Sequence, residues 1–149
     1  MRDLGEPGVV DASAILPIVD LERCTPRAEK WLAAVRQGAE ESITVDLFDV
    51  ECANALWKRV RRELWTPRRA EQALSQILEL PFRRVPLGTV VSDALLIALT
   101  HGLSAYDACY VALARISGLQ LVTADRRMAR VARATGCEAL CFTEDLGES

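Results

Sequence analysis

The sequence predicts a single α/β domain in which helices cover both faces of a parallel β-sheet of about five strands. Short apolar runs alternate with longer amphipathic segments, a pattern typical of parallel strands that are connected by helices. The chain has 149 residues, of which 50% are hydrophobic and 26% charged, so it can bury one sizeable core. No repeat or linker interrupts it, and we expect one domain over residues 1–149, with residues 1–8 as a short N-terminal extension.

Five short segments are expected to form the strands. Most are apolar runs that are too short for a helix and lie between helix or turn signals. The expected strands span residues 9–12, 42–45, 83–85, 119–123 and 138–142.

Helices are expected between these strands. Thr25 and Thr66 each precede a proline, and Ser104 stands where it can cap the next helix. Gly38 is expected to end the first of these three helices. The expected helices span residues 14–20, 26–37, 47–64, 67–80, 90–100, 105–117 and 126–135.

Apolar spacing predicts which helix faces are buried. In segment 47–64 an apolar residue recurs every three or four positions, so we expect this stripe to be buried. The stripe consists of Val50, Ala53, Trp57, Val60 and Leu64. The helices after Pro26 and Pro67 carry further apolar positions, expected mainly in the core, with some at a groove or dimer face. These positions are Trp31, Leu32, Val35, Leu74, Ile77 and Leu78.

Four acidic residues stand where this fold would bring them together. Asp11 and Asp125 follow expected strands, and ligands of such folds bind beyond the carboxyl ends of the strands. Asp107 lies in the first turn of a helix, and Glu51 lies within the first turns of the helix after the second strand. All four side chains are therefore expected at one edge of the sheet.

Each acid also has an ordinary structural explanation. Asp11 and Asp125 can cap the helices that follow them. Asp107 has the spacing of a capping box with Ser104, and Glu51 can be a solvated helix residue. Periodicity does not exclude these roles, so the prediction of a site depends on the four acids together.

Crowded carboxylates need a counter-charge, because like charges ~4–6 Å apart raise each other's pKa values and cost stability. Mg²⁺ and Mn²⁺ favour oxygen ligands, so a few carboxylates can hold one or two ions. No histidine stands beside the acids, and we expect a metal-activated water instead of an imidazole base. Asn54 lies three residues after Glu51, on the same helix face, and is expected to orient it.

Charge and cysteine content narrow the class of protein. The formal net charge of −3 argues against a generally basic nucleic-acid coat. The basic clusters at residues 58–62 and 126–133 are either solvated helix faces or a phosphate-binding rim. The five cysteines lack ligand spacing, so free thiols in a reducing compartment are expected. Without a signal peptide or a run of ~20 apolar residues, we expect a cytoplasmic protein with no membrane partner.

Four motifs resemble those of the PIN-domain nucleases, and specifically of the VapC-type toxins of bacterial toxin–antitoxin modules. The motifs are VVDASA at 9–14, FDVECANAL at 48–56, LSAYDACYVALA at 103–114 and LVTAD at 121–125. Each is weak alone, but in this order they cover nearly the whole chain. One departure is that the proline often found shortly before the second motif is absent from residues 44–46.

The resemblance implies a PIN-like fold and an endoribonuclease that depends on Mg²⁺ or Mn²⁺. Asp11, Glu51, Asp107 and Asp125 map onto the family's catalytic and metal-binding acids, and Ser13, Asn54 and Thr123 map onto its supporting polar positions. Arg126 and Arg127 are expected to position the RNA. The family also implies a homodimer and a cognate VapB-type antitoxin that docks across the active-site groove.

Three alternatives stay open. A catalytically silent PIN domain would bind RNA or protein, although the presence of all four acids argues against it. A phosphoacceptor signalling domain would need a lysine after a late strand, whereas Lys30 and Lys58 lie in expected helices. A nuclease of related fold acting on DNA fits the same residues. The RNA target leaves no compact motif, because its recognition depends on surface shape and unpaired bases.

Overall fold

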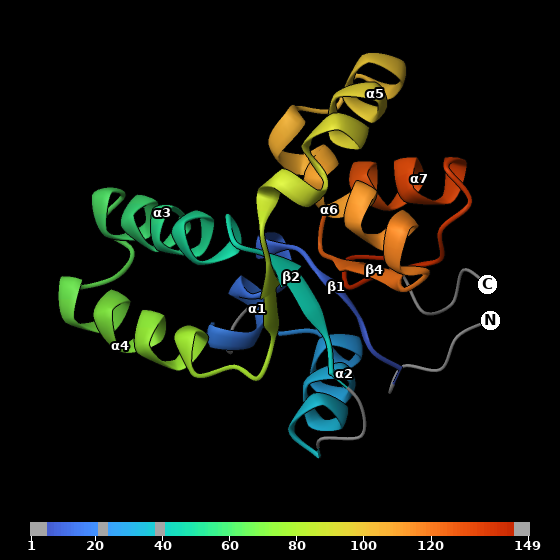
Figure 1. Ribbon diagram of the computed structural model, residues 1–149. Coiled ribbons are helices and arrows are strands. Elements are labelled where there is room, and N and C mark those ends of the chain that lie inside the picture. Colours follow the sequence, from blue (N-terminus) through green and yellow to red (C-terminus); the bar gives the residue numbers. More distant parts are fainter. Residues whose placement is uncertain (1–5, 21–23, 38–40, 145–149) are drawn as a thin grey trace.

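A computed structural model describes residues 6–20, 24–37 and 41–144 (Figure 1). Gly38, expected to end a helix, lies outside these ranges, as does most of the expected N-terminal extension. Gly8, the last residue of that extension, already belongs to the first strand.

The sheet has five strands, all parallel, in the order β3-β2-β1-β4-β5. The strands are β1 (Gly8–Val10), β2 (Ile43–Val45), β3 (Arg83–Val85), β4 (Gln120–Thr123) and β5 (Ala139–Cys141). The first strand is therefore central, and its two neighbours come from distant parts of the chain. The predicted fold class is confirmed, and each strand lies inside or within one residue of its expected segment.

Seven α-helices and two short 3₁₀ turns of the described residues connect the strands. The helices are α1 (Leu16–Val19), α2 (Pro26–Arg36), α3 (Phe48–Arg61), α4 (Pro67–Leu78), α5 (Val91–His101), α6 (Ala105–Ser117) and α7 (Arg126–Ala134). The 3₁₀ turns are η1 (Ala12–Ala14) and η3 (Leu87–Thr89). The hydroxyls of Thr25, Thr66 and Ser104 each accept a hydrogen bond from the backbone N–H three residues later, so the three predicted caps are confirmed.

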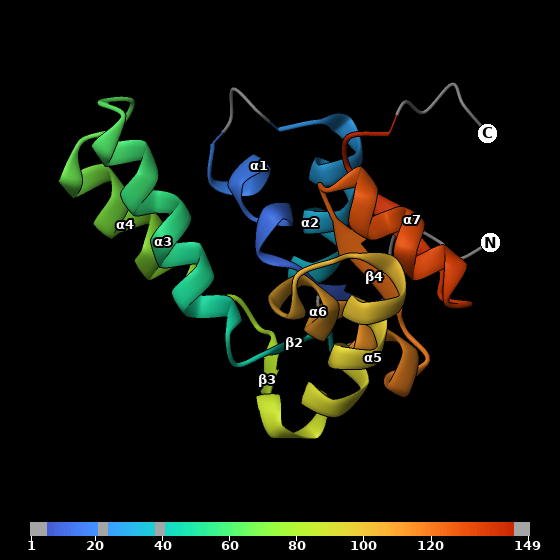
Figure 2. The ribbon, with the colours of Figure 1, turned by 90° about the horizontal axis from the view of Figure 1, so that it is seen from above.

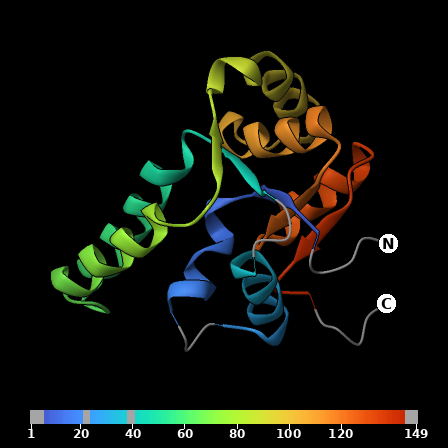
Figure 3. The ribbon, with the colours of Figure 1, turned by 60° about the horizontal axis from the view of Figure 1, so that its bottom comes forward.

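The helices form layers around the sheet. Figure 3 shows α5 and α6 on one side of the strands and α1 and α2 on the other. Helices α3 and α4 run side by side and project beyond the sheet (Figure 2). The α3–α4 pair thus forms one wall beside the carboxyl ends of the strands.

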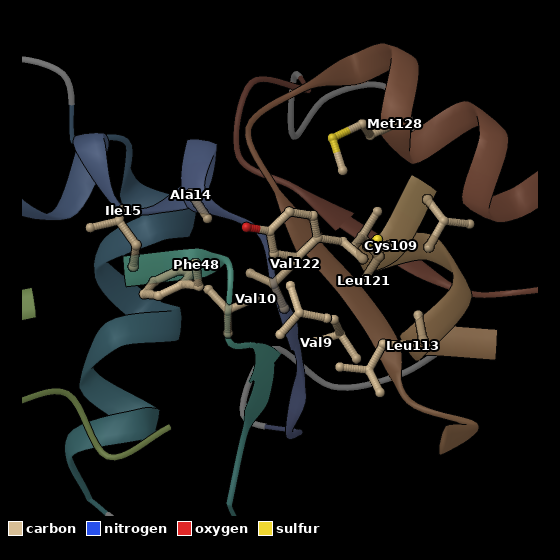
Figure 4. Close-up of a cluster of buried hydrophobic side chains, with 14 of the residues drawn as sticks. Val9, Val10, Ala14, Ile15, Phe48, Cys109, Leu113, Leu121, Val122 and Met128 are labelled. Carbon is tan, nitrogen blue, oxygen red and sulfur yellow. The ribbon is translucent and has the colours of Figure 1, made fainter. Parts of the chain in front are cut away.

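The core lies on both faces of β1. Val9 and Val10 are fully buried, and Figure 4 shows them between Phe48 of α3 on one side and Leu113 of α6 on the other. Trp31 of α2 packs against Phe82 and Phe142, with ring centroids 5.9 and 5.8 Å apart. These contacts fix α2, α3 and α6 against the strands that lead to the candidate site.

The expected buried stripe of α3 is wrong for most of its residues, although Val60 is partly buried against the core. Val50, Trp57 and Leu64 are 61%, 53% and 62% exposed, and α3 ends at Arg61. The helix instead buries the stripe of Phe48, Cys52 and Leu56. Both stripes have helical spacing, so periodicity alone could not choose between them.

The apolar positions of α2 and α4 behave mostly as expected. Trp31, Leu32 and Ile77 are buried, whereas Leu78 is exposed. All five cysteines are free, which agrees with the expected thiols. Among the described residues no single helix could span a membrane; α5 and α6 together meet the length and composition criteria but are bent by 113°.

Candidate active site

The site begins where β1 and β4 end side by side. Val10 pairs with Val122, and the backbone N–H of Asp11 donates to the Val122 carbonyl at 3.0 Å. Asp11 therefore sits directly beside the turn that carries Asp125. The parallel arrangement brings together two acids that are far apart in the sequence, as predicted.

Asp11 is buried and held by three donors. Its Oδ2 accepts hydrogen bonds from the Ser13 hydroxyl and, at 2.6 Å, from the Thr123 hydroxyl. Its Oδ1 accepts the backbone N–H of Ser13 at 3.3 Å, which makes Asp11 the cap of η1. Only 4% of the residue is exposed. These contacts fix the carboxylate rigidly at the end of β1.

Ser13 and Thr123 also tie the two strand ends to each other. Their hydroxyl oxygens are 3.1 Å apart. The Ser13 hydroxyl accepts the N–H of Ala124 at 3.0 Å, and the Thr123 hydroxyl accepts the N–H of Asp125 at 3.0 Å. The structure thus places both expected supporting residues in contact with Asp11 and with the turn before Asp125.

Glu51 reaches the same centre from the first turn of α3. Its Oε1 accepts a hydrogen bond from the hydroxyl of Tyr110, a buried residue of α6. Asn54, expected to orient Glu51, is exposed on the cavity wall, and the contacts of the described residues include no hydrogen bond between them. Tyr110 therefore makes the contact with Glu51 that we expected Asn54 to make.

Asp125 has the capping geometry that was left open as an alternative, whereas Asp107 lies in the first turn of a helix that Ser104 caps. The backbone N–H of Asp107 donates to Ser104 at the start of α6. Asp125 caps α7, with its Oδ1 accepting the N–H groups of Arg127 and Met128 at 2.8 and 3.3 Å. Both acids can still take part in the site, because the Ser104 cap uses the backbone N–H of Asp107 and the Asp125 cap uses only one of its carboxylate oxygens.

Electrostatics link the four carboxylates. Burial raises the pKa of Asp11 to about 6, against the opposing effect of its hydrogen bonds, and the charge of Asp107 adds to the rise. Burial and then Asp107 raise the pKa of Glu51. Burial and then Asp125 raise the pKa of Asp107, which Arg127 partly offsets. The acids are close enough to repel one another and lack full compensation by cations.

A cavity of about 950 Å³ opens at this edge of the sheet. Asp11, Glu51 and Asp107 line one part of it, whereas Asp125, at the start of α7, is not among the lining residues. The cationic side chains that line the cavity are Lys58, Arg59, Arg62 and Arg69, from the α3–α4 pair. The cavity is therefore acidic where the strands end and basic farther along α3.

Arg126 and Arg127 do not line this cavity. The guanidinium group of Arg126 donates to the Thr143 carbonyl at 2.5 Å, and that of Arg127 donates to the Gly102 carbonyl at 2.6 Å. The expectation that they position RNA receives no support from this geometry. Arg127 acts on the site through its charge, which lowers the pKa of Asp107.

The part of the chain that contains all four acids matches a known family. A family model described as the PIN domain matches residues 8–134. The chain belongs to the PIN-domain family. This PIN domain is 42% identical to Ribonuclease VapC3 of Pyrobaculum aerophilum over 124 residues, which cover 81% of this chain and 91% of that protein.

Other relatives agree with this family. Ribonuclease VapC12 of Mycobacterium tuberculosis is 34% identical over 123 residues, which cover 82% of this chain and 89% of that protein. Exonuclease VapC9 of Pyrobaculum aerophilum is 34% identical over 126 residues, which cover 80% of this chain and 81% of that protein. The crystal structure of PAE2754 from Pyrobaculum aerophilum superposes with a TM-score of 0.68 at 27% identity, covering 91% of this chain and 84% of that one.

The donors of this PIN domain suit the metal that its family implies. Asp11, Glu51 and Asp107 offer only carboxylate oxygens, the ligands that Mg²⁺ and Mn²⁺ favour, and a cation would relieve their mutual repulsion. Within the described part of the chain, no three His, Cys, Asp or Glu side chains are already grouped as a metal site. The fit therefore lies in donor chemistry and shared cavity, not in a preformed cage.

Sequence reasoning missed two contacts of this PIN domain. Tyr110 was quoted only as part of a motif, although it lies three residues after Asp107 and so near the same face of α6. Asp20 was overlooked as well. It is buried and pairs with Arg59 at 2.8 Å, which fixes the end of α1 to the cavity wall. A buried acid of this kind leaves no signal in the sequence, because its partner is 39 residues away.

Proposed function

We propose that this PIN domain is a Mg²⁺- or Mn²⁺-dependent endoribonuclease and the toxin of a VapBC-type toxin–antitoxin pair. The observation that carries the proposal is the convergence of Asp11, Glu51 and Asp107 on one cavity, each with a raised pKa. Two relatives named ribonuclease, which match this chain over most of their own length, support it.

The chain's own residues would prepare the site for hydrolysis of a phosphodiester bond. A bound divalent ion supplies a Lewis acid and lowers the pKa of water that it carries. Asp11 is fixed by Ser13 and Thr123, and Glu51 is oriented by Tyr110. Asp107 and Asp125 add charge beside them, so that all four would favour cation binding once they are ionised.

The partners belong to the same proposal. The substrate is RNA, and a cognate VapB-type antitoxin binds across the groove and blocks it. The protein acts in the cytoplasm as a homodimer. The exposed apolar face of α5, formed by Val91, Leu95 and Leu99, suits association with a second copy.

The nuclease proposal is tested with Asp11→Asn and Asp107→Asn. Each variant should lose RNA cleavage and keep the wild-type circular dichroism spectrum, whereas Asp93→Asn, an exposed acid on α5, should stay active. EDTA should abolish cleavage by the wild type, and Mg²⁺ or Mn²⁺ should restore it. Full activity in both site variants would exclude the assignment.

A circular RNA substrate tests internal cleavage. An endonuclease converts the circle to a linear strand, whereas an exonuclease, the activity in the name of the VapC9 relative, leaves it intact. The alternative of a catalytically silent PIN domain predicts that RNA is bound but that neither circular nor linear strands are cut at any metal concentration.

A further inference from the structure

One face of α3 forms a wall of the cavity and changes charge along its length. Glu51, Asn54, Lys58 and Arg62 are spaced three or four residues apart and all line the cavity. Glu51 lies beside the other acids, and Arg62 follows the last helical residue. At a rise of 1.5 Å per residue, the eleven steps from Glu51 to Arg62 separate the two ends by ~16 Å.

Two of the four cations in the cavity have structural partners. Arg59 is buried and pairs with Asp20 at 2.8 Å. Arg69 lies over the Trp65 ring at 3.9 Å from its centroid and 3.9 Å from Asp20. Both arginines therefore hold α3, α4 and the end of α1 together. Their charges are largely used within the protein.

Lys58 and Arg62 differ from this pair. Both are exposed, and within the ranges that the structure describes neither side chain makes a hydrogen bond or ion pair. They bring two positive charges to a cavity whose opposite end is acidic. Both charges are therefore available to an anionic ligand that enters the cavity.

We propose that Lys58 and Arg62 form a phosphate subsite that holds the RNA backbone away from the bond being cleaved. The inference rests on the proposed nuclease function and extends it. A strand with its reacting phosphate at the acidic end would carry later phosphates along α3 toward these cations. The cavity volume of about 950 Å³ exceeds the need of a metal site alone and suits a short stretch of polyanion.

The substrate at this subsite is an unpaired strand. Tyr106, next to Asp107, lines the cavity and exposes its ring, whereas Trp65 is buried beneath Arg59 and Arg69. An exposed tyrosine ring stacks on a base only when that base is not paired. The cavity thus combines a stacking ring at the acidic end with backbone contacts at the basic end.

Binding without cleavage tests the subsite directly. Fluorescence anisotropy in EDTA measures the affinity for a labelled single-stranded RNA of ~10 nucleotides. The variant Lys58→Ala/Arg62→Ala should bind RNA more weakly, by about tenfold for each of the two side chains. Its slope of log affinity against log salt should be shallower by about 0.7 per cation removed. The charge-matched control Lys30→Ala/Arg36→Ala, with both residues exposed and outside the cavity, should bind like the wild type.

Kinetics separate this inference from the nuclease proposal. With Mg²⁺, the wild type should prefer the longer RNA over a dinucleotide, and the Lys58→Ala/Arg62→Ala variant should lose that preference through a higher KM. An unchanged affinity, salt slope and length preference in this variant would overturn the subsite. A wild type that binds RNA through these two residues but cleaves neither substrate would overturn the nuclease proposal and leave the subsite standing.

Discussion

Among single residues, Asp11 shows how the site reduces the stability of the fold, because its buried carboxylate is ionised at neutral pH. Its carboxylate is buried, and burial raises its pKa from 3.8 to about 6. A raised carboxyl pKa stabilises the folded state below the unfolded pKa, and this contribution is lost as the pH rises through about 6. The ionised form, which a cation requires, is therefore the less stable one in the absence of metal.

This linkage predicts an unusual pH dependence. In EDTA, the wild type should lose about 2 kcal/mol more unfolding free energy between pH 4 and pH 8 than Asp11→Asn does, since each pKa unit is worth ~1.4 kcal/mol and part of the effect is already lost at pH 4. Urea denaturation of both proteins at the two pH values measures the difference. Millimolar Mg²⁺ should reduce it at pH 8, and an equal pH dependence of the two proteins would contradict the burial effect.

Tyr110 gives a second prediction for a single residue. Tyr110→Phe removes the hydrogen bond that holds Glu51 and leaves the ring in the core. We expect RNA cleavage to need a higher Mg²⁺ concentration for half-maximal rate, with a stability loss of only about 1 kcal/mol. Titration of activity and of melting temperature with Mg²⁺ measures both effects.

The matched change on the same helix is Tyr106→Phe. Its hydroxyl is on an exposed side chain, so the Mg²⁺ concentration for half-maximal rate should stay at the wild-type value. An identical metal requirement in Tyr110→Phe and the wild type would show that the Tyr110 hydroxyl does not position Glu51.

The proximity of two acids could be predicted from sequence because their place follows from topology. Asp11 and Asp125 follow strands, and parallel strands end at one edge, so their proximity required no knowledge of packing. Tyr110 and Asp20 contact partners on other helices, and those contacts depend on how α6 and α1 pack against α3. No periodicity or spacing encodes such packing.

Helix α3 shows the same limit for a whole element. Its existence and its start were predictable, but two apolar stripes compete for the core. The stripe of Phe48 and Cys52 is buried because Phe48 packs against Phe82, with ring centroids 5.9 Å apart. The opposite stripe faces the cavity and solvent. The rotation of a helix about its axis is set by its neighbours, which the sequence of that helix does not describe.

The buried pair of Asp20 and Arg59 ties α1 to α3 and gives a prediction about these elements. Asp20→Ala would leave Arg59 buried without its 2.8 Å partner, so we expect a loss of about 3–5 kcal/mol. Urea denaturation measures it. The exposed pair of Glu41 and Arg83 is the control, and Glu41→Ala should cost under about 1 kcal/mol. Equal effects of the two variants would mean that burial adds nothing to the first pair.

The whole molecule exposes an apolar face that its own fold leaves uncovered. Leu99 of α5 is 74% exposed, in line with Val91 and Leu95 on the same side of the helix. Isolated surface leucines are ordinary, but three apolar side chains in line on one helix suit the proposed dimer interface. This face lies on α5, whereas the sequence had suggested a dimer face among residues of α2 and α4.

The proposed dimer is tested by light scattering after size exclusion. The wild type should elute with the mass of two chains, and Leu95→Glu should elute as one, because a charge at the centre of the face opposes its burial. Ile116→Glu on α6, a similarly exposed apolar position, should remain dimeric. A single-chain mass for the wild type at micromolar concentration would exclude the dimer.

The order of the strands has a consequence for how the protein is made. β1 forms early in synthesis, but its neighbour β4 and the turn with Asp125 come only at residues 120–125. Asp11 gains its Thr123 hydrogen bond only after that segment has left the ribosome. A growing chain therefore lacks part of the candidate site until most of the protein has been synthesised, so we expect the proposed nuclease to become active only after its own translation is nearly complete.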